Sequence, residues 1–156
     1  MPTRPPAVLF VCLGNICRSP LAEAAFRARA EAAGLEAVVD SAGVGDWHVG
    51  DPPDRRAQAA ALRHGVDIAG YRARQVEVGD FARFTHIFAM DRSNLADLRR
   101  IAPPGHPAEL SLLLDLIEDS RGKSVADPYF GGAEGFEATW RQIDAAAAAL
   151  VQRLLR

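Results

Sequence analysis

Apolar runs alternate with helix-forming stretches along this chain of 156 residues. Four short apolar runs have the length and composition of buried strands, and they lie at positions 7–11, 37–41, 85–90 and 109–114. Stretches rich in strong helix formers predict helices between and after these strands, at about 21–33, 54–64 and 91–100 and again near the C-terminus. The pattern is therefore one of strands and helices in alternation.

Residues with special backbone preferences mark the ends of these elements. Ser19 is placed to act as a helix N-cap, and Pro20 suits the first helical position, where a missing N–H costs nothing. Asp91 is a candidate cap for a later helix, and Gly34 can end the first one. The connecting stretches are expected to be irregular, with one short helical turn in the second of them: 43–53, 66–81 and 117–132.

The C-terminal helix carries a single apolar stripe that should pack on the sheet. Its members recur at spacings of three and four residues, and they are Phe136, Trp140, Ile143, Ala147, Leu150, Val151 and Leu154.

Strands that alternate with helices predict an α/β fold. We expect a three-layer sandwich, in which a doubly wound, four-stranded parallel sheet has helices on both faces. Residues 7–156 are expected to form a single domain after a flexible tail at 1–6. Ligands bind to such sheets beyond the carboxyl ends of the strands. Cys12, at the end of the first strand, therefore lies where a ligand is expected.

Composition and charge narrow the range of functions. The formal net charge of −2 gives no reason to expect a partner in nucleic acid or at a membrane surface. No apolar run is long enough to span a bilayer, and the first residues lack the apolar core of a signal peptide. Two cysteines five residues apart do not form a secreted disulfide framework. We therefore expect a cytoplasmic protein.

The segment that joins the first strand to the first helix carries the main candidate chemistry. It reads Val-Cys-Leu-Gly-Asn-Ile-Cys-Arg-Ser-Pro from Val11 to Pro20, which combines a thiol, a tight turn of backbone amides, a guanidinium and a helix N-terminus. All of these stabilise negative charge, so the loop can hold a phosphate-like dianion and keep Cys12 as a nucleophilic thiolate. The fork of Arg18 can hold two phosphoryl oxygens. These features predict a cysteine-based phosphatase.

Such chemistry also needs a proton donor for the leaving oxygen. Asp127 is the best candidate, because it precedes Pro128 in a long loop with aromatic residues close by. An Asp-Pro pair is also typical of an ordinary turn, so the local sequence leaves both interpretations open. The spacing of Cys12 and Cys17 further suggests that oxidised Cys12 could be trapped as a disulfide.

Along nearly its whole length the chain resembles the low-molecular-weight protein tyrosine phosphatase family, in its bacterial form. The matching segments are 11–23, 40–43, 73–76, 90–91 with 94–95, and 127–129. The resemblance implies a phosphotyrosine phosphatase I-like fold with flavodoxin-like winding. It also implies hydrolysis of phosphotyrosine and small aryl phosphates through a phosphocysteine intermediate, with no metal or cofactor.

The resemblance assigns a role to each matching residue. Cys12 is the nucleophile, Arg18 and the loop amides hold the phosphoryl oxygens, and Asp127 acts as acid and then as base. Ser19 donates a hydrogen bond to the Cys12 sulfur. Phosphate binding falls to the loop residues Leu13, Gly14, Asn15, Ile16, Cys17 and Ser19, of which Asn15 shapes the loop with help from Ser41.

The walls of the site should select the substrate. Trp47 and Tyr129 resemble the family's two aromatic walls, between which a phenyl ring could lie, with Leu13 and Ile16 beneath it. Tyr71 stands where many relatives have a histidine that braces the loop asparagine. Surface or packing roles are expected for four scattered histidines: His48, His64, His86 and His106.

Three other functions remain open alternatives. Phosphoarginine phosphatases share the resemblance but tend to have threonine where Ile16 stands. Arsenate reductases of this fold need a further cysteine, and the chain has two cysteines in all. A non-catalytic phosphoprotein-binding module would have no use for Cys12, Arg18 and Asp127 together. The expected partners are a tyrosine-phosphorylated protein and, in the loop, phosphate or another oxyanion.

Overall fold

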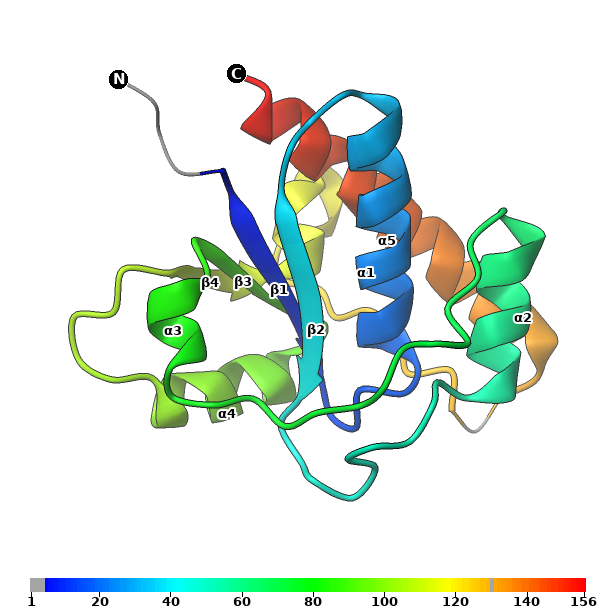
Figure 1. The fold of residues 1–156 in the computed structure, drawn as a ribbon, viewed down its shortest axis with the longest axis horizontal. Helices are drawn as coiled ribbons and strands as arrows, with labels where there is room; N and C mark the ends of the chain where they lie inside the picture. Colours follow the sequence, from blue (N-terminus) through cyan, green and yellow to red (C-terminus); the bar gives the residue numbers. More distant parts are fainter. Residues whose placement is uncertain (1–4, 130) are drawn as a thin grey trace.

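A four-stranded parallel sheet forms the centre of the protein (Figure 1). The structure is a computed structural model that describes residues 5–129 and 131–156, so most of the expected tail at 1–6 lies outside the described residues. The strands lie in the order β2-β1-β3-β4, with the bounds β1 Ala7–Cys12, β2 Val38–Gly43, β3 His86–Ala89 and β4 Glu109–Leu112. All three strand pairs are parallel, so the predicted α/β fold and its flavodoxin-like winding are confirmed.

Helices cover both faces of the sheet. They are α1 Arg18–Ala32, α2 Arg55–Arg63, α3 Asp80–Arg83, α4 Arg92–Ile101 and α5 Ala133–Leu154. In Figure 1, α1, α2 and α5 lie on one side of the sheet, and α3 and α4 lie on the other. Because the chain leaves β1 toward β2 on one side and returns through β3 on the other, a topological switch point lies at the carboxyl end of β1.

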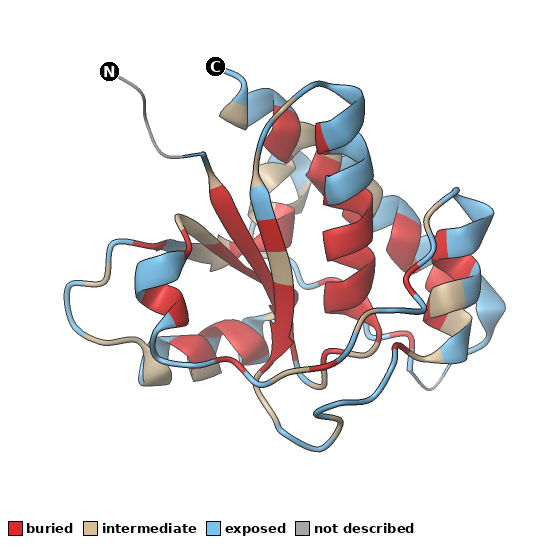
Figure 2. Ribbon diagram, in the orientation of Figure 1, coloured by how far each residue is buried: buried red, intermediate tan, exposed pale blue. Residues whose placement is uncertain are grey.

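Alternate side chains of β1 supply two separate cores. Val8 and Phe10 belong to the cluster under α1 and α5, whereas Leu9 and Val11 belong to the cluster under α3 and α4. Successive strand residues point to opposite faces, so a strand covered on both sides is apolar throughout. Figure 2 shows β1 buried along its length, as the unbroken apolar run predicts.

The apolar stripe of α5 is buried as predicted. Phe136, Ile143 and Leu150 are fully buried, and they share the cluster that contains Phe10. The helix packs mainly along α1, which lies between it and the edge of the sheet formed by β2.

Three predicted element ends are wrong by two residues or more. The second strand continues to Gly43, two residues past its predicted end at 41. The fourth strand ends at Leu112, and Leu113–Leu116 form a 3₁₀ turn, because the buried apolar run continues past the last strand pairing. The first helix begins at Arg18 with Cys17 as its N-cap residue, so Ser19 lies inside the helix and does not cap it, and Pro20 is the third helical residue, not the first. Asp91 does cap α4, since its side chain accepts a hydrogen bond from the backbone N of Asn94.

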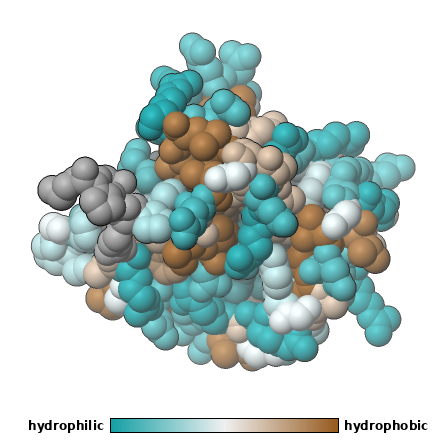
Figure 3. Space-filling model, turned by 45° about the horizontal axis from the view of Figure 1, so that its top comes forward, coloured by the Kyte–Doolittle hydropathy of each residue, from teal (hydrophilic) through white to brown (hydrophobic). Residues whose placement is uncertain are grey.

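The face of the molecule shown in Figure 3 is largely hydrophilic. Figure 3, which turns the upper part of the molecule toward the viewer, shows polar side chains interrupted by separate apolar patches. Within the described residues, none of the helices has the length and apolar character needed to cross a membrane.

Candidate active site

The loop between β1 and α1 is fixed by the end of β2. The backbone N of Val44 donates to the carbonyl of Cys12, and that of Gly45 donates to the carbonyl of Leu13, both at 2.9 Å. A Cβ atom on Gly43 would lie 2.9 Å from the Leu13 carbonyl oxygen, which is too close. Glycine at this position therefore allows the loop to pack directly on the strand end.

Asn15 shapes the loop from its centre. Its φ of 58° is the only positive value at a non-glycine position among the described residues, and asparagine tolerates this left-handed conformation better than most residues. The side chain is bound at both ends: Nδ2 donates to Ser19 Oγ at 2.8 Å and to Ser41 Oγ at 3.0 Å, while Oδ1 accepts from the backbone N of Arg74 at 3.0 Å. These three bonds hold the strained backbone in place.

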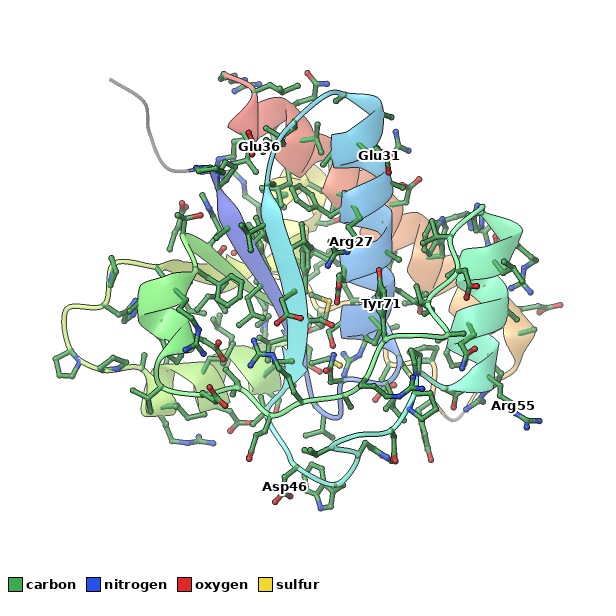
Figure 4. The ribbon with its side chains drawn as sticks, viewed as in Figure 1. Arg27, Glu31, Glu36, Asp46, Arg55 and Tyr71 are labelled. Carbon is green, nitrogen blue, oxygen red and sulfur yellow. The ribbon has the colours of Figure 1, made fainter. Side chains whose placement is uncertain are left out.

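Tyr71 takes no part in these bonds. Its side chain lies against Arg27 of α1, as Figure 4 shows, close enough for the two groups to affect each other's pKa. Burial and the nearby charge of Glu23 raise the pKa of Tyr71, so it is a neutral phenol at physiological pH. Asn15 is therefore braced by Ser41 and the Arg74 backbone, and Tyr71 does not take the bracing position that the resemblance suggested for it.

The hydrogen bonds of Asn15 determine how Ser19 meets the sulfur of Cys12. The Arg74 N–H can only donate, so the atom facing it must be the Asn15 oxygen, and the NH₂ group must face Ser19. The Ser19 hydroxyl therefore accepts from Asn15, and its own proton has two acceptors within reach: Cys12 Sγ at 3.0 Å and the more distant carbonyl of Ala42 at 3.4 Å. The shorter distance favours the sulfur. The backbone N of Asn15 donates to the same sulfur at 3.3 Å. Both donors stabilise a thiolate at Cys12.

The N-terminus of α1 adds to this stabilisation. The helix begins beside the loop, and the side chain of Cys17 makes no capping hydrogen bond. The N–H groups and the dipole of the first turn thus favour an anion in the loop. Cys17 itself is buried, and its pKa is raised by burial, by Asp54 and by Cys12. Cys17 therefore remains a protonated thiol while Cys12 is the candidate nucleophile.

Arg18 is buried and held on one side. Its Nη1 atom donates to Asp91 Oδ2 at 2.8 Å and to the carbonyl of Val125 at 3.0 Å. Its Nη2 atom lies 3.6 Å from Asp127 Oδ2. Because Nη1 is held by these two hydrogen bonds, the Nη2 side of the guanidinium is directed toward Asp127. The guanidinium and the carboxylate therefore line the same pocket.

A pocket of about 250 Å³ brings most of the predicted site residues together, whereas Asn15, Ser19, Ser41 and Tyr71 lie outside its lining. It is lined by Cys12, Leu13, Gly14, Ile16, Cys17, Arg18, Trp47, His48, Asp127 and Tyr129. Asp127 is half-exposed there, and its Oδ1 atom accepts from the backbone N of Tyr129 at 3.0 Å, which is an Asx turn. This turn joins the candidate acid to one wall of the pocket.

The two aromatic residues stand at the mouth of the pocket. Trp47 is 70% exposed, and its ring lies over Gly45, where a Cβ atom would come within 1.9 Å of the ring. Tyr129 is 40% exposed. Exposed aromatic surface of this kind beside a phosphate-sized pocket suits an aryl ligand.

His48 lines the pocket, although the sequence pattern did not predict it there. It lies next to Gly14 and pairs with Asp51 at 3.2 Å, whereas we expected a surface or packing role. Its position directly after Trp47 was the available signal. The other three histidines do pack away from the pocket; His64, for example, stacks on Trp140 at 4.8 Å.

Asp91 has a second role that its cap position did not reveal. One carboxylate oxygen caps α4, and the other binds Arg18. Asp91 follows the end of β3, the strand next to β1, so its side chain lies at the same sheet edge as Cys12. The contact between Asp91 and Arg18 could not be predicted, because the sequence does not show directly that β3 lies next to β1.

A thiol at the end of the first strand of a parallel sheet, within an amide loop and beside an arginine and a carboxylate, is typical of cysteine-dependent phosphatases. Comparison with known proteins agrees with this class. The family model for low molecular weight phosphotyrosine protein phosphatase matches residues 7–156. The chain belongs to that family, and it is a protein tyrosine phosphatase.

Relatives from several kingdoms support this assignment. The chain is 48% identical over 132 residues to a low molecular weight phosphotyrosine protein phosphatase of Schizosaccharomyces pombe, covering 83% of this chain and 84% of the relative. The crystal structure of YfkJ from Bacillus subtilis is 41% identical, covers 98% of this chain and 96% of its own, and gives a TM-score of 0.90. Eukaryotic and bacterial relatives both match, so membership of a bacterial form stays a prediction.

Proposed function

We propose that Cys12 is the nucleophile of this phosphatase and that the reaction passes through a phosphocysteine. The observation that carries the proposal is the position of the Cys12 sulfur: it receives hydrogen bonds from Ser19 and the Asn15 amide at the base of a pocket that also contains Arg18 and Asp127. A nucleophile, a cation and a proton donor are thus within one small volume.

In the first step, the thiolate of Cys12 attacks phosphorus and forms the S–P bond while the P–O bond to the aryl group breaks. The leaving oxygen takes the proton of Asp127, so the phenol departs neutral. The loop amides and the Nη2 side of Arg18 stabilise the charge that develops on the equatorial oxygens.

In the second step, Asp127, now a carboxylate, takes a proton from water. The water oxygen attacks phosphorus, the S–P bond breaks, and inorganic phosphate leaves. The sulfur departs as a thiolate, which the Ser19 hydroxyl stabilises through the hydrogen bond at 3.0 Å. The step returns every group to its starting protonation state without a metal or cofactor.

We propose a phosphotyrosine side chain of a protein as the substrate. Its ring would lie between Trp47 and Tyr129, with Leu13 and Ile16 beneath it and the phosphate in the loop. The structure of Wzb from Vibrio vulnificus in complex with benzylphosphonate supports this arrangement, because that relative is 27% identical, covers 96% of this chain and has a TM-score of 0.84. Benzylphosphonate joins an aromatic ring to an oxyanion.

Phosphoarginine is the second candidate substrate. A Drosophila arginine phosphatase is 37% identical over 94% of this chain, with a TM-score of 0.87. Ile16 argues against it, because an aliphatic side chain at the pocket floor offers a guanidinium no hydrogen bond and suits a flat phenyl ring.

We further propose that the protein is a single domain over residues 7–156 that acts in the cytoplasm. The match to the family model over 7–156 supports the first point. The two unpaired cysteines support the second, since free thiols are typical of reducing compartments.

The proposal is tested by comparing wild-type protein with Cys12→Ser. Wild-type protein should hydrolyse para-nitrophenyl phosphate and a phosphotyrosine peptide, and it should leave a phosphoarginine peptide largely intact. Cys12→Ser should lose turnover by more than about 10³-fold yet retain binding of the phosphotyrosine peptide in calorimetry, because the amide loop remains. Wild-type-like activity in Cys12→Ser, or preferential hydrolysis of phosphoarginine, would contradict the proposal.

A further inference from the structure

Arg56 joins two loops of the active site that are far apart in sequence. Its Nη1 atom donates to the carbonyl of Gly131 at 2.7 Å, and its guanidinium lies 5.6 Å from the ring centre of Tyr129 and 4.7 Å from that of Phe136. It therefore contacts the loop of Asp127 and the first turns of α5 at once.

The other side of Arg56 is fixed by Asp54, the N-cap of α2. The carboxylate of Asp54 accepts from Arg56 Nε and Nη2, both at 3.0 Å, and from the Arg56 backbone N at 2.8 Å. These hydrogen bonds lower the pKa of Asp54, so the pair stays charged at physiological pH. The guanidinium is thus held in one orientation.

Asp54 in turn is anchored to the phosphate loop. Its backbone N donates to the carbonyl of Ile16 at 2.9 Å. A continuous path of hydrogen bonds and a cation–π contact therefore leads from Ile16 through Asp54 and Arg56 to Tyr129 and Gly131.

The loop that receives this contact has little regular structure of its own. Residues 123–128 form neither helix nor strand, and Asp127 is half-exposed. Within its own loop, Asp127 accepts a hydrogen bond from the backbone N of Tyr129, and its Oδ2 atom lies 3.6 Å from Arg18 Nη2.

The residues just before Asp127 are tied to the fold, because the backbone N of Val125 donates to the carbonyl of Met90 at 2.8 Å and Thr139 Oγ1 donates to that of Ala126 at 3.4 Å. Arg56 supplies a contact on the other side of Asp127, where a displacement of about 1 Å can cost about 10²-fold in rate.

We propose that Arg56 is a positioning residue for the general acid. It holds Tyr129 and Gly131, which follow Asp127 in the chain, at a fixed distance from the phosphate loop through Asp54. It touches neither the nucleophile nor the phosphoryl group; it acts through the placement of Asp127. The inference rests on the proposed function of Asp127 as proton donor.

The neighbouring Arg55 provides a matched control. It is the first residue of α2 and is exposed, and Figure 4 shows its side chain extending away from the protein. Arg55→Ala removes the same charge from the same helix turn without touching the loop of Asp127. Arg56→Lys keeps the charge of Arg56 but loses the fork that binds Asp54 and Gly131 together.

The test compares kcat/KM for aryl phosphates with poor and good leaving groups, because kcat/KM reports the first step, in which Asp127 is the acid, and not the later hydrolysis, in which it is the base for every substrate. In Arg56→Ala, kcat/KM for phenyl phosphate should fall by about 10-fold, while kcat/KM for a phosphate ester with a strongly acidic phenol should change by less than about 2-fold, because only the first needs the proton. Arg56→Lys should fall in between, and Arg55→Ala should match wild type.

A double variant shows whether Arg56 acts through Asp127. In the Asp127→Ala background, Arg56→Ala should cause no further loss of kcat, because the group that it positions is gone. Equal losses for both leaving groups, or additive losses in the double variant, would overturn the inference and leave Arg56 a structural residue. If Asp127→Ala itself showed no dependence on the leaving group, the proposed role of Asp127 would fail instead.

Discussion

Asn15 shows how a single side chain can set the chemistry of its neighbours. Because the Arg74 amide fixes which end of Asn15 is oxygen, the orientation of the Ser19 hydroxyl toward Cys12 follows from the hydrogen-bond pattern. Ser41 continues the pattern: it accepts from Asn15 and donates to the buried carboxylate of Glu23 at 2.7 Å. The reactivity of Cys12 therefore depends on residues that never meet the substrate.

Asn15→Ala should weaken both catalysis and folding. It removes three hydrogen bonds and places alanine at a φ of 58°, which together should cost about 3 kcal/mol of unfolding free energy. We expect kcat to fall by about 10²-fold, because the loop amides and Ser19 lose their alignment. Urea unfolding and steady-state kinetics measure the two effects.

Tyr71→Phe is the control for this prediction. Its side chain lies against Arg27 and takes no part in the hydrogen bonds of Asn15, so kcat should stay within about 2-fold of wild type. A loss in Tyr71→Phe as large as in Asn15→Ala would mean that Tyr71 braces the loop after all.

Asp127→Ala should depend on the leaving group. Removal of a general acid costs about 10² to 10⁴-fold where the leaving oxygen needs a proton, and much less where it does not. A series of substituted phenyl phosphates measures this as a steeper dependence of kcat/KM, which reports the first step, on the acidity of the phenol. Parallel losses across the series would remove Asp127 as the acid.

At the scale of elements, the ends of strands and helices create the site. The carboxyl ends of β1 and β3 bring Cys12 and Asp91 to one edge of the sheet. The helices α1, α2 and α4 all begin near this edge. Asp54 and Asp91 are both N-cap residues, and each also binds an arginine of the site: Arg56 and Arg18. The same two carboxylates thus cap helices and orient arginines of the site.

The two roles of Asp91 can be separated by two variants. Asp91→Asn retains a good N-cap but loses the charge that pairs with the buried Arg18, so kcat should fall by about 10-fold and the unfolding free energy should fall only by the cost of that ion pair. Asp91→Ala should lose both, with a further cost of about 1 kcal/mol in unfolding free energy. Equal stability losses in both variants would contradict this separation.

The sequence predicted the elements well where a pattern repeats and poorly where a single contact decides. The alternation of apolar runs gave four strands, and the stripe on α5 gave its buried face. The prediction of Ser19 as a helix N-cap was wrong because its hydroxyl makes hydrogen bonds with Cys12 Sγ and Asn15 Nδ2 instead of capping the helix. The candidate site had a local signature in Cys12 and Arg18, whereas His48 and Arg56 depend on how loops meet in space.

At the scale of the whole molecule, buried charges link stability to pH. Asp80 is fully buried at the start of α3; burial raises its pKa, but hydrogen bonds from Arg74, the Glu77 backbone and Arg83 outweigh burial and lower it below its ordinary value of 3.8. A carboxyl group whose pKa is lower in the folded protein than in the unfolded chain stabilises the fold. This stabilisation is fully present at a pH above the unfolded pKa, and it is lost as the pH falls through the folded pKa. Glu23 has the opposite sign, because burial raises its pKa.

Asp80→Asn should therefore cost most at neutral pH. Removal of one partner of a buried ion pair should lower unfolding free energy by about 3 kcal/mol at pH 7, and the difference from wild type should shrink as pH falls below about 4. Glu23→Gln should show the reverse trend, with relative stability that improves as pH rises. Thermal melts between acid and neutral pH test both signs, and a difference that does not change with pH would contradict the assignment.

The most direct test of the account is to locate the phosphoryl group during turnover. Wild-type protein mixed with excess para-nitrophenyl phosphate and quenched in acid within the first turnovers should carry phosphate on one cysteine, which peptide mass spectrometry should identify as Cys12. Cys17, a buried thiol with a raised pKa, should remain unmodified. Phosphate on Cys17 or on any other residue, or turnover with no phosphorylated Cys12 at any time, would contradict the account.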